Sequence, residues 1–313
     1  MEAGKNRDQL KGSLLLLLGA VIWGAAFSAQ RMGMDHVGPF TFSGIRMLLS
    51  GVVLIPFAHW SENRRGRHGE KSAESVRLQR KAGILCGIFL CVATSLQQIG
   101  LVTVSAGKAG FITALYVVLV PIAGWLVFRT RVGWLVWVGV LMAVAALYLL
   151  CVPDGGFRVE EGDLLLVGCA VCFTGQILCV DRFSPKVNGF ALARDEFLFS
   201  GAVCMAVALI TEPISLSGIR EALIPILYTG IMSGAVGYTL QIYGQRTVDP
   251  TVASLLMCLE SVFAVLTGIL LLGEVMTVRE AVGCVLMFAA VILAQLSPVL
   301  SGIRHSIRLR RLR

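Results

Sequence analysis

The chain has 313 residues, of which 56% are hydrophobic and 15% are charged, and its formal net charge is +8. A soluble domain carries about 25% charged residues, and a soluble core at this length could not bury so much apolar surface. These values exclude a water-soluble globular protein and favour an integral membrane protein, in which the position of each charge matters more than the sum.

Ten apolar segments follow one another along the chain, and a membrane-spanning helix needs ~20 mainly apolar residues. The first segment comes after Lys5, Arg7 and Lys11 and continues to about Arg31. It is therefore too long for the apolar part of a signal peptide. We expect spanning helices at residues 12–31, 40–60, 82–101, 107–128, 132–151, 162–181, 189–210, 222–243, 250–272 and 278–297.

Lysine and arginine gather in alternate connections between these segments. If the N-terminus is inside the cell, 20 of the 27 Lys and Arg residues lie on the inner side. The positive-inside rule then predicts a multi-pass protein of the cell (inner or plasma) membrane with both termini cytoplasmic. We interpret the basic tail, residues 298–313, as an anchor at an anionic leaflet. No aromatic residues alternate with its basic ones, so we expect no nucleic-acid partner.

The sequence lacks the patterns that accompany catalysis or bound cofactors. Cys169 and Cys172 form a CxxC, but no second pair or histidine cluster completes a metal site. The other cysteines lie mostly in apolar runs, where a reduced thiol behaves as a small hydrophobe. Walker A, GxGxxG, HExxH and GxSxG motifs do not occur. We therefore expect no metal, no cofactor and no enzymatic activity.

Two long stretches match each other without gaps at a shift of 144 residues. Residues 96–126 align with residues 240–270, and a shift of 150 aligns Ser50-Gly51 with Ser200-Gly201. Each half then holds five helices, and because five is odd, the second half enters the membrane from the opposite side. Many secondary transporters have such an inverted repeat, with a solute site between the halves near the midplane.

Three runs carry the motifs of a known family: LLGAVIWGAAF, QQIGLVTVSAGKAGFITALYVVLVP and LLMCLESVFAVLTGILLLGEVMTVREAVG. In these runs the sequence resembles the EamA domains of the drug/metabolite transporter superfamily. The resemblance implies an all-α membrane protein with ten transmembrane helices, arranged as two inverted five-helix EamA repeats. It also implies a central cavity lined by helices 1, 3, 4, 6, 8 and 9. The repeats would cover residues 12–151 and 152–297, after a cytoplasmic N-terminus at 1–11.

Polar side chains inside the apolar segments are the candidate solute contacts, because such groups are costly at membrane depth. Gln97 and Gln241 are equivalent under the repeat, so we expect both to approach one central cavity. Gln98 and Tyr243 offer further hydrogen bonds. Hydrogen bonding between helices is the alternative for each of these residues. Trp23, beside a glycine, either lines the cavity or packs between helices.

Two charged residues are also candidates for the cavity. Lys108 begins a helix after the small-residue loop SAG, where it either binds a carboxylate or extends to the membrane interface. Glu260 lies near the bilayer centre, where a carboxylate must be protonated, paired or hydrated. It either couples transport to protons or has a structural role, and the repeat places Tyr116 at the matching position.

Other charges receive structural interpretations. We expect Glu274 to cap the last spanning helix. We expect Arg46, and the cluster Arg194, Asp195 and Glu196, to be neutralised by ion pairs, those of the cluster within the second half.

These features together predict a secondary active transporter, an exporter or permease, for small organic metabolites such as amino acids, amines or amphipathic drugs. Its partners would be the solute and the lipid bilayer, with proton coupling or facilitated flux left open, as is a homodimer. The alternative is a flippase for a lipid-linked head group, which would need a lateral opening between helices and a basic inner rim.

Overall fold

The computed structural model describes residues 2–66, 73–104, 106–129, 132–152, 160–272 and 276–310. Glu274, which we expected to be a helix cap, lies outside these residues. The described residues form helices and no strand. The first half comprises α1 (Glu2–Gly24), α2 (Ala26–Met34), α3 (Pro39–Gly66), α4 (Ala73–Thr103), α5 (Ala106–Ala114), α6 (Tyr116–Phe128) and α7 (Trp134–Cys151).

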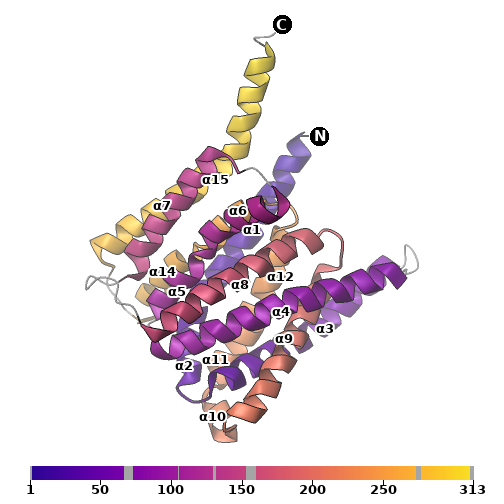
Figure 1. Cartoon of the computed structure of the whole chain (residues 1–313), viewed down its shortest axis with the longest axis vertical. Helices are drawn as coiled ribbons and strands as arrows, with labels where there is room; N and C mark the ends of the chain where they lie inside the picture. Colours follow the sequence, from indigo (N-terminus) through magenta and orange to yellow (C-terminus); the bar gives the residue numbers. More distant parts are fainter. Residues whose placement is uncertain are drawn as a thin grey trace.

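The second half follows the same plan with more interruptions. It comprises α8 (Glu161–Phe183), α9 (Gly189–Thr211), α10 (Leu216–Glu221), α11 (Leu223–Leu227), the π-helical segment η1 (Tyr228–Tyr238), α12 (Thr239–Gly244), α13 (Pro250–Met257), α14 (Glu260–Leu272) and α15 (Val278–Arg310). Figure 1 shows the two termini at the same end of the bundle. We call this end the N-terminal face.

Nine helical stretches in the described residues are long and apolar enough to cross a membrane. The tenth is α9, which has 23 residues but carries Arg194, Asp195 and Glu196 in succession. It packs along α3 and α4, so its charges lie against protein rather than lipid. The expected all-α fold with ten spanning helices is therefore confirmed.

Several spanning helices are interrupted where we expected continuous ones. The first breaks at Ala25, the fourth at Leu115 and the ninth at Cys258 and Leu259. At the last two breaks the amide of Leu115 donates to Ile112 at 3.2 Å, and that of Leu259 donates to Leu256 at the same distance. These tighter, 3₁₀-type bonds keep the backbone amides paired at the break.

The inverted repeat is visible in reciprocal contacts between α3 and α9. A Cβ atom at Gly51 would overlap Leu198, and one at Gly201 would overlap Leu48. A shift of 150 residues converts the first contact into the second. Rising numbers on α3 meet falling numbers on α9, so these equivalent helices run in opposite directions.

Other pairs of helices obey the same relation. Gly12 of α1 packs against Thr247, just after α12, and Gly162 of α8 packs against the equivalent Thr103 of α4. Gly139 of α7 packs against Ala290 of α15, and Gly283 packs against the equivalent Ala146. Glycines therefore bring the backbones together wherever the two halves meet.

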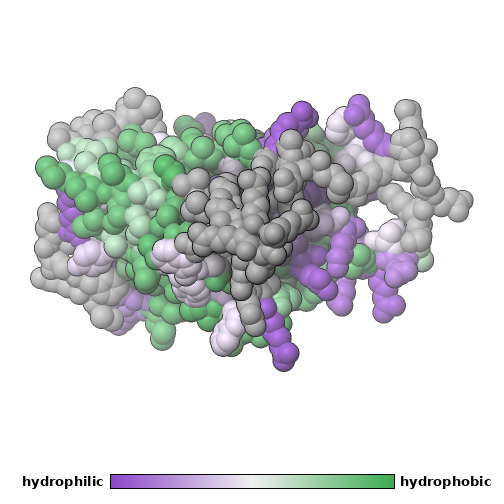
Figure 2. Space-filling view, turned by 90° about the horizontal axis from the view of Figure 1, so that it is seen from above, coloured by the Kyte–Doolittle hydropathy of each residue, from purple (hydrophilic) through white to green (hydrophobic). Residues whose placement is uncertain are grey.

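The flank of the bundle is suited to lipid. Exposed apolar side chains follow one face of individual helices, as at Ile84, Ile88 and Val92 of α4. Figure 2 shows apolar residues covering the flank, with hydrophilic residues gathered mainly toward one end. Because an aqueous surface would not tolerate such a continuous apolar band, the band marks the part of the protein that meets the bilayer.

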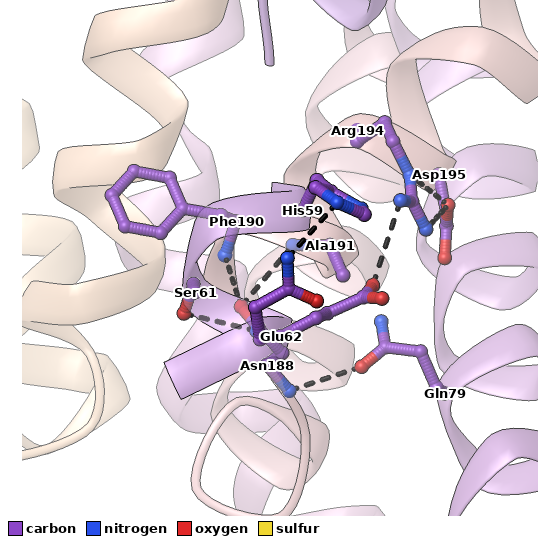
Figure 3. Close-up of polar contacts among 10 residues, drawn as sticks. His59, Ser61, Glu62, Gln79, Asn188, Phe190, Ala191, Arg194 and Asp195 are labelled. Atoms are coloured by element: carbon purple, nitrogen blue, oxygen red, sulfur yellow. Dashed lines mark hydrogen bonds and ion pairs between the residues drawn. The ribbon is translucent and has the colours of Figure 1, made fainter. Parts of the chain in front are cut away.

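A polar cluster joins α3, α4 and α9 at the N-terminal face (Figure 3). Arg194 contacts Asp195 at 2.8 Å and also Glu62 of the first half at 3.5 Å. Our expectation of pairing within the second half was therefore incomplete. The backbone amide of Asn188 donates to Gln79 at 3.0 Å, which links the start of α9 to α4 as well.

We predict that Gly201→Ala destabilises the protein and Gly110→Ala does not. A Cβ atom at Gly201 would lie 2.7 Å from the backbone nitrogen of Leu48, whereas one at Gly110 would meet nothing within 4 Å. Overpacking costs ~1–3 kcal/mol, while both variants gain the same helix propensity. Thermal unfolding in detergent should show a lower midpoint for Gly201→Ala alone, and equal midpoints would contradict the close contact of α3 with α9.

Candidate functional site

A cavity of about 580 Å³ lies between the two halves. Its lining is drawn from α1, α2, α3, α4, α5, α6, α8, η1, α12, α13 and α14, and so includes every interrupted spanning helix. The lining residues are Trp23, Ala26, Phe27, Gln30, Arg46, Thr94, Gln97, Thr113, Tyr116, Phe173, Gln176, Ile177, Ser233, Tyr238, Gln241, Met257 and Glu260.

The cavity surrounds the pseudo-twofold relation of the repeats. Fourteen of the lining residues form seven equivalent pairs, four at a shift of 144 and three at a shift of 150. The pairs are Thr94 and Tyr238, Gln97 and Gln241, Thr113 and Met257, Tyr116 and Glu260, Trp23 and Phe173, Ala26 and Gln176, and Phe27 and Ile177. A solute at the centre would therefore contact both halves at once.

Tyr116 and Glu260 are each the first residue after a helix break. Tyr116 begins α6 and Glu260 begins α14. Because the amides of a helix start carry partial positive charge, these positions favour a negative group. The side chain of Tyr116 also lies beside the Glu260 carboxylate. The two breaks therefore place one acid and one phenol at the wall of the cavity.

Glutamines form a hydrogen-bonded network on one side of the cavity. The amide of Gln241 donates to Gln176 at 3.1 Å and to Gln245 at 3.0 Å. Gln245 in turn donates to the carbonyl of Ile177 at 3.2 Å. On the other side, Gln97 donates to the hydroxyl of Thr113 at 3.4 Å. These bonds satisfy buried amides and fix which groups face the cavity.

Arg46 supplies a cation to the cavity. Its side chain is buried, its guanidinium lies 5.8 Å from the centre of the Phe42 ring, and its Nε atom has no hydrogen-bond partner in the described part of the chain. No carboxylate of the described residues forms an ion pair with it. The ion pair that we expected for Arg46 is therefore absent. Because arginine stays charged, the site favours an anionic group.

The structure brings five of the eight sequence candidates to this cavity: Trp23, Gln97, Tyr116, Gln241 and Glu260. Trp23 also donates from Nε1 to the carbonyl of Ser233 at 3.0 Å. Contact of these residues with a solute remains a prediction.

The other three candidates lie elsewhere. Gln98 is fully buried in α4, away from the lining, because the next residue on a helix points about 100° from Gln97. Tyr243 packs 5.3 Å from the ring of Phe190 and under the guanidinium of Arg246. Lys108 is buried and contacts Asp163 of α8 at 2.8 Å and Glu160 at 3.7 Å.

Sequence reasoning missed several lining residues. Arg46 and Gln176 are polar groups inside apolar segments, and that signal could have identified them. Thr94, Phe173 and Ser233 gave no comparable signal, because threonine, serine and phenylalanine are common in spanning helices. Among the described residues, no group of three or more His, Cys, Asp or Glu side chains is arranged to hold a metal ion.

Comparison with known proteins identifies the class to which this fold belongs. A model of the EamA-like transporter family matches residues 10–152 and 160–296. The chain therefore belongs to the EamA-like transporter family and is a multi-pass membrane transporter.

Full-length relatives agree with this assignment. A protein of Archaeoglobus fulgidus named as an uncharacterized transporter is 28% identical over 92% of this chain and 87% of its own length. The S-adenosylmethionine/S-adenosylhomocysteine transporter of Chlamydia muridarum is 25% identical, with coverage of 83% and 84%. One crystal structure matches with a TM-score of 0.73 at 18% identity, covering 91% of this chain and 96% of that one, which supports the fold alone.

We predict that Lys108 is structural and not a solute contact. Lys108→Met would leave Asp163 buried without its cation, which costs ~3–5 kcal/mol for a buried pair. The double variant Lys108→Met/Asp163→Asn should recover much of that loss in thermal unfolding measurements. Stable Lys108→Met protein that no longer binds or transports solute would instead assign Lys108 to the solute site.

Proposed function

We propose that the protein is a secondary active transporter for small organic solutes that carry charged groups, with amino acids and amines as the main classes. The cavity supports this proposal, since it combines Arg46 and Glu260 with glutamines and aromatic rings between two inverted repeats. Opposite charges at one site suit a solute with an ammonium group, a carboxylate or both. The cavity volume of about 580 Å³ suits a metabolite of this size.

The named relative from Chlamydia muridarum supports the same class of solute. S-adenosylmethionine and S-adenosylhomocysteine both contain an ammonium and a carboxylate on one carbon. We propose alternating access as the mechanism, because interrupted helices around a central site suit movement of one repeat against the other. We also propose that the N-terminal face is cytoplasmic, on the evidence of the lysine and arginine distribution.

The two adjacent glutamines of α4 provide a matched test. Gln97→Leu removes an amide from the cavity, and the loss of one hydrogen bond of ~1 kcal/mol weakens solute binding about fivefold. Gln98→Leu replaces a buried amide that has no partner among the described residues, so uptake and stability should be kept. Uptake by proteoliposomes should be measured against a panel of amino acids, amines and carboxylic acids. Equal effects of the two variants would contradict the proposed site.

A second test addresses proton coupling at Glu260, which we propose as the coupling residue. Glu260→Gln should keep the fold and solute binding but abolish uptake driven by a pH gradient, because an amide cannot exchange the proton. Glu221→Gln, at an exposed position paired with His36, is the control and should behave as wild type. Normal gradient-driven uptake by a stable Glu260→Gln protein would rule out coupling through this residue.

A further inference from the structure

Arg46 and Glu196 occupy equivalent positions in the two repeats, although their charges are opposite. The hydroxyl of Ser50 donates to the carbonyl of Arg46 at 2.8 Å, and the hydroxyl of Ser200 donates to that of Glu196 at 2.7 Å. A shift of 150 residues relates both members of each pair. The same serines also bond to a neighbouring helix: Ser50 to the carbonyl of Gly230 at 2.7 Å and Ser200 to that of Gly87 at 2.9 Å.

The backbone surroundings of the two residues are therefore alike. A Cβ atom at Gly230 would meet Leu49 and the Arg46 carbonyl, and one at Gly87 would meet Phe199 and the Glu196 carbonyl. Leu49 and Phe199 are again related by 150 residues. The glycines differ by 143 rather than 144, as expected if the π-helical segment η1 inserts one residue before Gln241.

The side chains, by contrast, lie in different environments. Arg46 lines the cavity, whereas Glu196 has no exposed surface and is absent from the lining. The side chain of Gln176 approaches the Glu196 carboxylate, yet neither carboxylate oxygen makes a well-formed hydrogen bond in the described part of the chain. A sealed, unpartnered carboxylate at membrane depth is costly and calls for an explanation.

The shape of the cavity supplies that explanation. Besides Ser233 of η1, only Gln30 and Arg46 line the cavity without their equivalents, which are Val180 and Glu196. Gln30 lies near the end of α2 that is opposite to the N-terminal face, while Val180 lies near the end of α8 at the N-terminal face. The cavity therefore departs from symmetry in one direction, away from the N-terminal face.

We propose that Glu196 lines the cavity of the opposite conformation, in which the cavity extends toward the N-terminal face and Arg46 is sealed. The proposal rests on the proposed transport function, because in inverted repeats the two conformations are related by exchange of the two halves. Val180 then becomes accessible while Gln30 is buried. The charge beside the solute changes from a guanidinium in one state to a carboxylate in the other. The first state thus favours an anionic group of the solute and the second favours an ammonium group.

Cysteine labelling in sided membrane vesicles tests this proposal without a known solute. Gln30→Cys, Val180→Cys and Ile177→Cys would each be treated with membrane-impermeant methanethiosulfonates, one bearing a sulfonate and one a trimethylammonium group. Wild-type protein, with its nine cysteines, gives the background. Ile177 already lines the cavity near its centre, so labelling of Ile177→Cys from both faces reports that the protein alternates.

We expect Val180→Cys to react only from the N-terminal face and Gln30→Cys only from the other. The cationic reagent should be preferred at Val180→Cys on the order of tenfold, because a nearby charge concentrates its counter-ion. Added Glu196→Gln should remove that preference, whereas Arg46→Gln should remove the anion preference at Gln30→Cys. If Val180→Cys does not fold, the reagent preference at Ile177→Cys from the N-terminal face serves instead.

Three outcomes would overturn the proposal. Labelling of Ile177→Cys from both faces without labelling of Val180→Cys from the N-terminal face would remove the exchanged cavity alone. A preference unchanged by Glu196→Gln would remove Glu196 from that cavity. Labelling of Ile177→Cys from one face only would show that the protein does not alternate, and the proposed transport function would then fail together with the inference.

Discussion

Polar groups at membrane depth cannot face lipid, and this constraint governs the rest of the structure. The three consecutive charges of α9 lie against α3 and α4, and the buried Lys108 meets carboxylates at the start of α8. Helix breaks obey the same rule, because the residues at Leu115 and Leu259 keep tight amide bonds and lie beside the central cavity rather than on the flank. The bundle therefore collects its polar chemistry at its centre.

Close packing of equivalent helices gives that centre its symmetry. Glycines at 51 and 201 let α3 and α9 approach closely, and glycines at 139 and 283 do the same for α7 and α15. These uninterrupted helices form the parts of the bundle with the fewest ways to rearrange. The helices that line the cavity are interrupted instead, as between α1 and α2 or between α13 and α14. A scaffold of close contacts thus surrounds segments that can change their angles at a few residues, which suits a transporter that must open to two sides.

The two repeats share a backbone plan but differ in charge. Tyr116 of one half faces Glu260 of the other, and Arg46 of one half corresponds to Glu196 of the other. Two identical halves would give the same surroundings to a solute in both conformations. Replacing single residues within a symmetric frame allows the site to bind a solute from one side and release it on the other, because only differential interaction shifts a conformational equilibrium.

The sequence by itself determined the ten spanning helices, the two repeats and the family, since apolar length, internal matches and motif order do not depend on how the helices pack. It also identified Gln97, Gln241 and Glu260 as costly groups at membrane depth. Only the tertiary structure decided which face of a helix meets the cavity. In lipid a spanning helix is apolar on every side, so its pattern gives no direction. For this reason the adjacent Gln97 and Gln98 could not be told apart, Arg46 was assigned an ion pair that it does not make, and the environment of Glu196 emerged only from the packing of α9.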